Sequence, residues 1–308
     1  MTLYVRGELR YTMELKLLIT KMIEQTGHQP FLFAGSGFSK RYMQAEKWDE
    51  LLKIFCEEFS GNPFQYNLYE NMIKEKDYYG KQPAIASFLE KDYNKAVLTL
   101  EKYKEFRDNH EDELKNNCSA LKLAISEHLE TMQCDFQNEE ILLLRELGKR
   151  SLSGIITTNY DTLPEQLFQK FTTYIGQEEL LFSSISGIGE IYKIHGSVTK
   201  PESLILTAED YLEFEEKQSY LIAKLLTIFL EYPVIFIGYS LNDRNIRNIF
   251  ETISNCLTQE KLDRLKERLI FVEYSAQKDI SEFSMQFSNG NSIRMNKVST
   301  MDFLEIYK

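Results

Sequence analysis

Residues 29–40 read QPFLFAGSGFSK, and this stretch decides the fold class of the chain. Its apolar part is short and closed by a glycine, which is typical of a buried strand that ends in a tight turn. Apolar residues then recur at helical spacing, at Trp48, Leu51, Leu52 and Phe55. A strand, a glycine loop and a helix in this order let a phosphate meet a helix N-terminus, although the loop could equally be a plain turn.

Further strand and helix patterns extend this unit in both directions. Apolar residues at helical spacing predict a first helix, at Leu15, Leu18, Ile19 and Met22. After residue 153, four short runs rich in Ile and Val read GIITTN, IYKIHG, PVIFIGYS and RLIFVEY, and helical patterns follow at least two of them. This alternation predicts an α/β fold with a Rossmann-like, mostly parallel sheet and helices on both faces. Ligands bind such sheets beyond the carboxyl ends of the strands, where the polar motifs described below lie.

The stretch between these two strand-bearing parts has a different texture. Gly80 is the only glycine between Asn62 and Leu147, and amphipathic patterns such as SALKLAISEHLETM predict helices with charged outer faces. We therefore expect one domain over residues 1–308. It would have a Rossmann-like core at about 1–60 and 150–308 and a helical insertion module at about 61–149.

Composition excludes several classes of protein. The 47 acidic and 36 basic residues give a net charge of −11, so nucleic acid and anionic lipid are not expected as partners. No apolar run is long enough to span a bilayer and no cleavable leader is apparent, so we expect a cytoplasmic protein. The chain has four cysteines, Cys56, Cys118, Cys134 and Cys256, and none of them forms a CxxC pair. This argues against a disulfide framework and against a metal site.

The loop AGSGFS, residues 34–39, is the first candidate binding motif. Gly35 and Gly37 carry no Cβ, so a ligand can approach the backbone closely there. The hydroxyls of Ser36 and Ser39 could donate hydrogen bonds to phosphate oxygens, and the dipole of the following helix would favour an anion.

Residues 157–168, TTNYDTLPEQLF, leave a strand and enter a helix with Pro164 in its first turn. Asp161 or Thr162 is expected to be an ordinary N-cap of that helix. Capping does not explain Asn159 at the strand tip. An amide there would point into the crevice and could orient a ribose hydroxyl or a water.

A histidine stands at the end of another strand, in YKIHGS, residues 192–197. His195 is followed by Gly196, which leaves room beside the ring, and we expect the imidazole to serve as a general base. Further on, Thr207 and Asp210 have the spacing of a capping box, which needs no functional interpretation.

The run FIGYSLNDRNI, residues 236–246, supplies the fourth motif. Gly238 and Ser240 follow the strand and are expected to face the same crevice as the glycine loop. Asp243 is expected to cap the next helix.

Together these motifs resemble those of the sirtuin family. In chain order, AGSGFS, TTNYD, KIHGS and IGYS are similar to its glycine–serine loop, Asn-x-Asp segment, His-Gly pair and Gly-(Thr/Ser)-Ser segment. The forms TTNYD and GYS look closest to the sirtuin-like branch found in bacterial anti-phage defence proteins. The resemblance covers about residues 29–60 and 150–275 and leaves the helical insertion without a motif.

Sirtuins bind NAD and cleave its nicotinamide–ribose bond, and the resemblance implies a role for each matched residue. Asn159 would orient the ribose and the attacking water, Asp161 would hydrogen-bond the nicotinamide carboxamide, and His195 would act as the base. The other matched positions would bind the cofactor: Ala34, Gly35, Ser36, Gly37 and Ser39 along the diphosphate, Thr158 beside Asn159, Gly238, Tyr239 and Ser240 on the adenosine side, and Glu273, after the last strand, at the adenine ribose.

Departures from the sirtuin pattern indicate which activity to expect. Deacylating sirtuins carry a zinc ribbon of two CxxC pairs and a Gly-Ile-Pro-x-Phe-Arg segment, whereas this chain has no such pairs and reads KRYMQAEKWDELL after its loop. Water is then the natural acceptor, so the resemblance implies an NAD hydrolase that releases nicotinamide and ADP-ribose without a metal. A module that senses NAD or ADP-ribose without cleaving it, and an NAD-dependent protein deacylase or ADP-ribosyltransferase, remain as alternatives.

An NAD hydrolase must be restrained, because constant activity would deplete the NAD of its own cell. The resemblance implies a regulated effector of anti-phage defence that acts by abortive infection and assembles into an oligomer. It also implies a partner in some cases, such as a DNA-translocating ATPase. The chain ends at MDFLEIYK, close to the last expected element, so we expect control through self-association or a separate partner.

Overall fold

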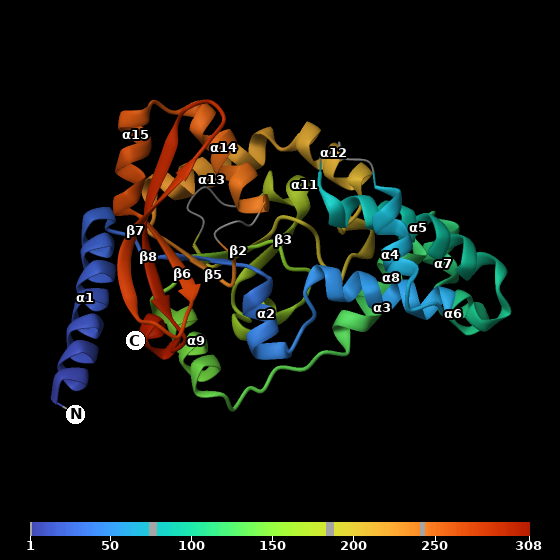
Figure 1. Cartoon of the computed structure of the whole chain (residues 1–308), viewed down its shortest axis with the longest axis horizontal. Helices are drawn as coiled ribbons and strands as arrows, with labels where there is room; N and C mark the ends of the chain where they lie inside the picture. The colour runs from blue at the N-terminus through green and yellow to red at the C-terminus, as the bar shows by residue number, and fades with distance from the viewer. Residues whose placement is uncertain (1, 74–78, 183–187, 241–243) are drawn as a thin grey trace.

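The computed structural model describes residues 2–73, 79–182, 188–240 and 244–308, and an eight-stranded sheet lies at its centre (Figure 1). The strand order is β3-β4-β2-β1-β5-β6-β8-β7. The strands are β1 (Phe31–Ala34), β2 (Gly154–Thr157), β3 (Thr172–Ile175), β4 (Glu190–Lys193), β5 (Val234–Ile237), β6 (Leu269–Tyr274), β7 (Asp279–Gln286) and β8 (Ser292–Thr300). Neighbouring strands run parallel except for the antiparallel pair β7 and β8. The expected α/β fold with a mostly parallel sheet is therefore confirmed.

Side chains alternate along each strand, so both faces of the sheet carry apolar residues. Helices cover both faces. On one face Phe33 packs in a cluster with Phe229 and Phe236. The helices of this face are α11 (Gly176–Leu180), α13 (Ser219–Glu231), α14 (Arg244–Cys256) and α15 (Gln259–Asp263). On the other face Leu32 packs in a second cluster with Ile155. The helices there are α1 (Thr2–Thr26), α2 (Ser36–Met43), α9 (Glu139–Arg150), α10 (Leu163–Leu167) and α16 (Leu304–Tyr307).

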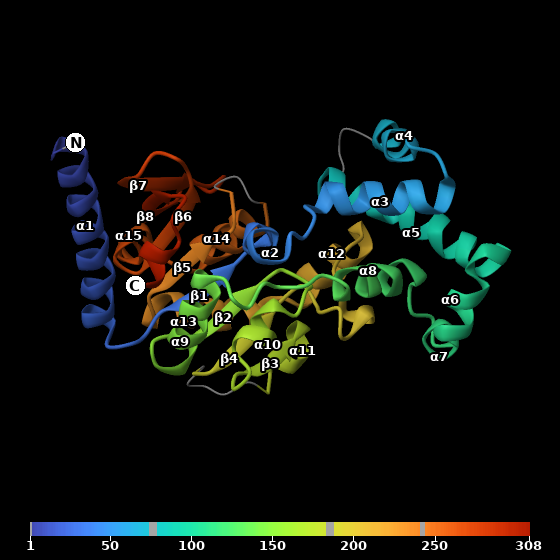
Figure 2. The same cartoon turned by 90° about the horizontal axis from the view of Figure 1, so that it is seen from below.

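A group of helices lies beside the sheet, at the end of the molecule away from α1 (Figure 2). It consists of α3 (Trp48–Ser60), α4 (Gln65–Met72), α5 (Lys81–Thr99), the short helix Glu101–Tyr103, α6 (Lys104–Asn109), α7 (Glu111–Lys115) and α8 (Ala120–Glu130). We call residues 48–130 the helical module. Its own apolar cluster also takes in Val198, Leu204 and Leu206 from the segment after β4.

The limits of this module differ from those expected from the sequence. Helix α3, assigned to the Rossmann-like core, packs through Leu52 and Phe55 into the cluster of the helical module. Helix α9, assigned to the insertion, packs through Ile141 and Leu144 against the sheet. Periodicity identified both helices, but it does not indicate which partner an apolar stripe contacts.

Three strands were not expected from the sequence. β3 is a short edge strand whose residues are exposed or half-buried, and it lacks the apolar run that marks the inner strands. β7 and β8 form a hairpin after β6, and β7 is mostly polar because it lies at the sheet edge. Glu273 therefore lies within β6, which is not the last strand.

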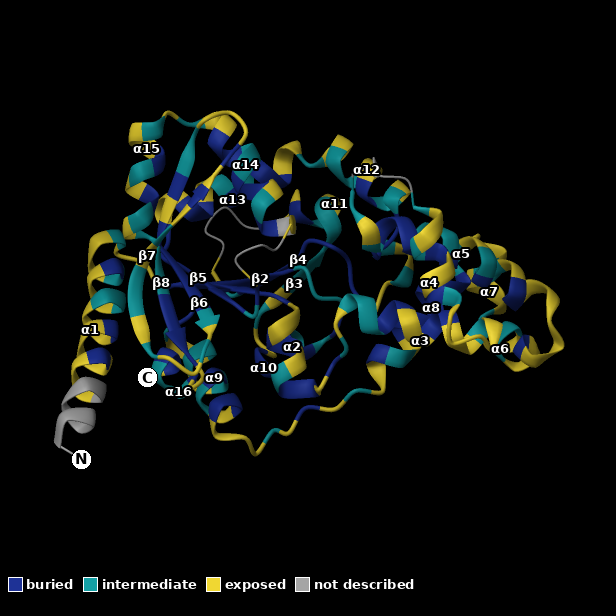
Figure 3. Cartoon of the chain, viewed as in Figure 1, coloured by how far each residue is buried: buried dark blue, intermediate teal, exposed yellow. Residues whose placement is uncertain are grey.

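Several local predictions are met by the structure. Thr207 and Asp210 form both hydrogen bonds of a capping box at the start of α12 (Ala208–Lys217). The inner strands are buried, whereas the outer faces of α1 and of the helical module are exposed (Figure 3). Two further short helices, Pro201–Ser203 and Arg264–Glu267, complete the described elements. Across the described ranges, every helix is too short or too polar to cross a bilayer.

Candidate active site

A cavity of about 190 Å³ lies at the carboxyl ends of the inner strands. Seven of the residues singled out in the sequence line it: Ser36, Ser39, Thr158, Asn159, Asp161, His195 and Tyr239. The opposite wall is largely apolar and comes from the helical module and α12, through Trp48, Leu51, Leu129 and Tyr211. The cavity therefore lies between the sheet and the helical module.

The turn after β2 is held by its own threonine. Thr157 donates through Oγ1 to the carbonyl of Ala34 on β1, over 2.8 Å. The same oxygen accepts the backbone N–H of Asn159, over 2.9 Å. This pair of bonds fixes the tip of β2 to the tip of β1, so that Asn159 lies beside the glycine loop.

The orientation of the Asn159 amide follows from its acceptors. Its Nδ2 donates to the carbonyl oxygen of Gly35 and to Oγ of Ser39, each over 2.8 Å. A carbonyl oxygen can only accept, so the nitrogen must face Gly35 and both of its N–H groups are used. Oδ1 has no hydrogen-bond donor among the described residues, and it is the atom left to accept from a water or a ribose hydroxyl.

Ser39 belongs to this polar network. Its Oγ accepts from Asn159 and donates to Oδ2 of Asp161 over 2.6 Å, and the residue is only 3% exposed. Its single hydroxyl proton is engaged with Asp161, so donation to a phosphate would require this bond to break and stays a prediction.

Asp161 has a hydrogen-bond partner on each of its carboxylate oxygens. Oδ1 accepts the backbone N–H of Leu163 over 3.0 Å and so caps the start of α10, while Oδ2 accepts from Ser39. The residue is 4% exposed but still lines the cavity. Each carboxylate oxygen can accept more than one hydrogen bond, so contact with a carboxamide stays a prediction.

The glycine loop is tighter than the sequence indicated, because α2 begins at Ser36 and only Gly35 forms the turn. The N–H of Gly35 donates to the carbonyl of Ile237, and that of Gly37 donates to the carbonyl of Gly238, both over 2.8 Å. Both amides are thus engaged with the segment after β5, and contact between this loop and a diphosphate stays a prediction. Ser36 is exposed at the N-terminus of α2, where its hydroxyl remains accessible.

Packing against the segment after β5 explains the glycines. A Cβ on Gly35 would lie 2.7 Å from the ring of Tyr239, and one on Gly37 would lie 2.8 Å from the carbonyl oxygen of Gly238. Gly238 has a φ of +78°, and a Cβ there would lie 2.3 Å from the backbone nitrogen of Phe38. These residues let two backbones approach closely, which is a structural role.

Tyr239 closes the floor of the cavity beneath Ala34, the last residue of β1. Its hydroxyl donates to the carbonyl of Ala34 over 3.1 Å and lies 3.0 Å from Oγ1 of Thr158. Ser240 is exposed and does not line the cavity. Asp243 lies outside the described residues.

His195 follows β4 and is 4% exposed. The rings of Tyr211 and Phe214 meet the imidazole edge to face, with centroids at 5.6 and 5.1 Å. Burial lowers the pKa of His195 to about 4, so the ring is neutral at pH 7 and can accept a proton. Gly196 has a φ of +92° and accommodates the backbone of Ser203, so its role is local backbone geometry.

Tyr160 lines the cavity together with its two neighbours in the chain, and it also contacts the helical module. Its ring packs against the apolar cluster of the module, and its hydroxyl donates to the carbonyl of Ile205 over 2.5 Å. The loop after β2 therefore contributes Asn159 and Asp161 to the polar network and Tyr160 to the module.

Glu273 does not reach the cavity. Its Oε2 accepts from Oγ of Ser299 over 2.8 Å and pairs with Nζ of Lys297 over 3.1 Å, both on the neighbouring strand β8. These hydrogen bonds lower the pKa of Glu273. The predicted contact with the adenine ribose is not supported, because the carboxylate is engaged within the sheet.

The residues that sequence reasoning missed are those of the apolar wall. Trp48 stacks on Tyr211 with ring centroids 6.0 Å apart, and Leu51 and Leu129 lie beside them. In the sequence these residues have only the spacing of core positions. In the described parts of the chain, no group of three or more His, Cys, Asp or Glu side chains is placed to hold a metal ion.

Comparison with known proteins matches the part of the chain that runs from β2 to the start of β8. Residues 153–294 match the family described as the SIR2-like domain. This stretch of the chain is similar to SIR2-like domains. The sirtuin resemblance of the sequence motifs is therefore confirmed, and the matched residues include both Asn159 and His195.

Curated relatives are similar to this chain over short segments. Defense-associated sirtuin 2 of Bacillus subtilis is 30% identical over 105 residues, which is 32% of this chain and 10% of that protein. NAD(+) hydrolase ThsA of Bacillus cereus (strain MSX-D12) is 25% identical over 42% of this chain and 32% of that protein. NAD(+) hydrolase ThsA of Acinetobacter baumannii (strain 532279) is 28% identical over 35% of this chain and 23% of that protein. The matches thus span a third or less of the length of these relatives.

Proposed function

We propose that this SIR2-like chain hydrolyses NAD to nicotinamide and ADP-ribose. The observation that carries the proposal is that Asn159 and His195, from the ends of two neighbouring strands, line one cavity. The names of two relatives, which are NAD(+) hydrolases, support the same reaction.

The chemistry assigns distinct tasks to these two side chains. The bond between ribose C1′ and the nicotinamide nitrogen breaks, and the electron pair leaves with nicotinamide. A water oxygen forms the new bond to C1′ and loses one proton. Oδ1 of Asn159 would accept a hydrogen bond from that water or from a ribose hydroxyl, and neutral His195 would accept the proton.

The charge state of His195 suits this reaction. The nicotinamide ring of NAD is positively charged, and positive charge develops on the ribose as the bond breaks. A protonated imidazole nearby would oppose both. Because burial lowers the pKa of His195 to about 4, the ring places no positive charge there at neutral pH.

The size of the cavity bears on access. At about 190 Å³ it is smaller than the roughly 300–1,000 Å³ that is typical of small-molecule sites. We therefore propose that NAD enters when the apolar wall formed by Trp48 and Leu129 moves away from the sheet. A site that must open fits an enzyme held inactive until it is triggered, as proposed for an effector of anti-phage defence.

The experiment is to incubate the purified protein with NAD and to identify the products by chromatography and mass spectrometry. Equal amounts of nicotinamide and ADP-ribose, lost in Asn159→Ala, are expected. NAD bound without any product would instead indicate a sensing module. Transfer of acyl or ADP-ribosyl groups in the presence of an acylated peptide or a protein acceptor would indicate a transferase or deacylase. Light scattering alongside activity would test the proposed control by self-association or by a partner protein, because a fully active monomer would contradict it.

A further inference from the structure

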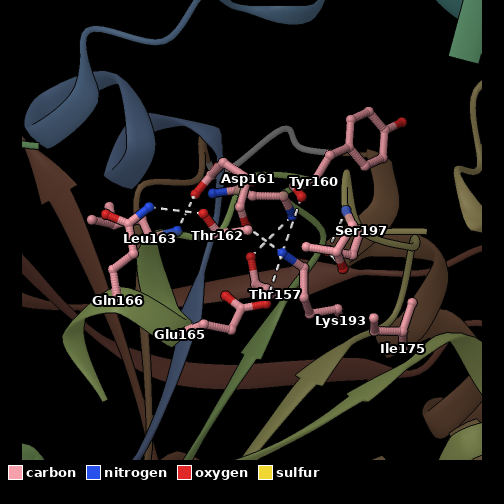
Figure 4. Close-up of polar contacts among 12 residues, drawn as sticks. Thr157, Tyr160, Asp161, Thr162, Leu163, Glu165, Gln166, Ile175, Lys193 and Ser197 are labelled. Carbon is pink, nitrogen blue, oxygen red and sulfur yellow. Dashed lines mark hydrogen bonds and ion pairs between the residues drawn. The ribbon is translucent and has the colours of Figure 1, made fainter. Parts of the chain in front are cut away.

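Lys193, the last residue of β4, is a fully buried lysine next to the loop after β2. Its side chain is 0% exposed, and an ammonium group is costly to bury unless its charge and its donors are satisfied. Nζ donates to the carbonyl oxygen of Tyr160 over 3.0 Å and to that of Asp161. It also lies 3.3 Å from Oε1 of Glu165 on α10. Three acceptors thus match its three N–H donors (Figure 4).

The two carbonyls held by Lys193 belong to the loop that carries the candidate active-site groups. Asn159 immediately precedes Tyr160, and Asp161 is itself one of the bonded residues. The carbonyl of Tyr160 accepts a second hydrogen bond, from the backbone N–H of Val198 over 2.9 Å. Lys193 is absent from the cavity lining, so it acts on the site indirectly, and its contacts with this loop offer a route.

We propose that Lys193 is a positioning residue that fixes the backbone of Tyr160 and Asp161 and thereby aligns the Asn159 amide with the Asp161 carboxylate. The inference rests on the proposed function, because it assigns a task within that site. Glu165 balances the charge of the buried ammonium group, while the two carbonyl contacts set the position of the loop.

A purely structural role would predict a different result from double substitution. If Lys193 and Glu165 only neutralise each other, removing both charges restores the protein, since a buried ion pair can often be replaced by uncharged groups. If the carbonyl contacts align the loop, removing both charges preserves folding but leaves the loop misaligned. The variant Lys193→Met/Glu165→Gln separates these cases. Glu165→Gln alone is the control that keeps both carbonyl contacts, and it should lower the free energy of unfolding because the ammonium group loses its counter-charge.

The test compares kcat, KM and amide hydrogen exchange in the full chain. In the double variant we expect kcat for nicotinamide release to fall about 100-fold while KM stays nearly constant. Exchange should become faster at the amides of Asn159 and Leu163, which are bonded to Thr157 and Asp161. Glu165→Gln should keep the exchange pattern and most of kcat.

The outcomes are decisive even if the proposed function fails. Unchanged exchange or an unchanged kcat in a folded double variant overturns the positioning role. A wild-type protein that releases no nicotinamide contradicts the proposed function alone. In that case the exchange at Asn159 and Leu163 still decides whether Lys193 holds the loop.

Discussion

The segments after β2 and β5 both carry motifs that resemble sirtuin sequences, yet they contribute differently. After β2, the contribution comes from side chains: Asn159 and Asp161 form a continuous hydrogen-bond chain along the cavity through Ser39 of α2. After β5, the contribution comes from the backbone: the carbonyl of Gly238 accepts the N–H of Gly37, and there is no space for a Cβ at Gly238. Resemblance to sirtuin motifs thus accompanies a side-chain network in one segment and close backbone packing in the other.

The largest expected effect is the loss of nicotinamide release when Asn159, in the segment after β2, is replaced. Asn159→Ala removes the amide whose Oδ1 is the group available to a water or ribose, so nicotinamide release should fall by about a thousandfold. Product formation under saturating NAD measures this. Asn138→Ala is the matched control, because Asn138 caps α9 away from the cavity and should affect only stability. Full turnover in Asn159→Ala would contradict the proposed role of the segment after β2 in the reaction.

The pH dependence of stability extends the comparison to the strand end of β4. His195 has a pKa of about 4 when folded and about 6.5 when unfolded, so between these values the unfolded chain binds more protons. Its contribution is complete above about pH 6.5 and is lost as the pH falls toward 4, by roughly 3 kcal/mol. Urea unfolding at pH 7 and pH 4 measures this. Between these pH values, the free energy of unfolding of His195→Phe should fall by that much less than that of the wild-type protein. Equal losses in both proteins would contradict the burial of a neutral imidazole.

Substitution in the segment after β5 should lower the free energy of unfolding and leave the rate of NAD cleavage per folded molecule unchanged. Gly238→Ala places a Cβ at a positive φ and against the backbone of Phe38, so the free energy of unfolding should fall by about 2 kcal/mol or more. Gly290→Ala is the control, because Gly290 has a φ of +84° but open space around it, and it should cost only about 1 kcal/mol. Similar losses in the two variants would mean that close packing is not the reason for Gly238.

The smallest effect separates the two interpretations of the glycine–serine loop. Ser39→Ala removes the link between Asn159 and Asp161, so kcat should fall about tenfold while KM for NAD changes little. Ser36→Ala, at the exposed N-terminus of α2, should raise KM instead, because an anion can still reach that hydroxyl. Steady-state kinetics of both variants would decide. A raised KM in Ser39→Ala would support its role as a phosphate ligand.

Sequence reasoning predicted the fold and much of the cavity, because those depend on local patterns. Short apolar runs that end in polar residues identified β1, β2, β4, β5 and β6, and parallel strands bring their carboxyl ends together. The sequence could not indicate that the hydroxyl of Ser39 and the amides of Gly35 and Gly37 are already used, since their partners are between 120 and more than 200 residues away in the chain. Nor did spacing distinguish α3 from α9 by the surface that each contacts.

The placement of Tyr160 has a mechanical consequence. Its ring is part of the apolar cluster of the helical module, and its peptide joins Asn159 to Asp161. Any swing of the module that admits the coenzyme must therefore either pull this ring free or carry the asparagine with it. If NAD enters as proposed, substrate entry and the orientation of the Asn159 amide are coupled through the side chain of Tyr160.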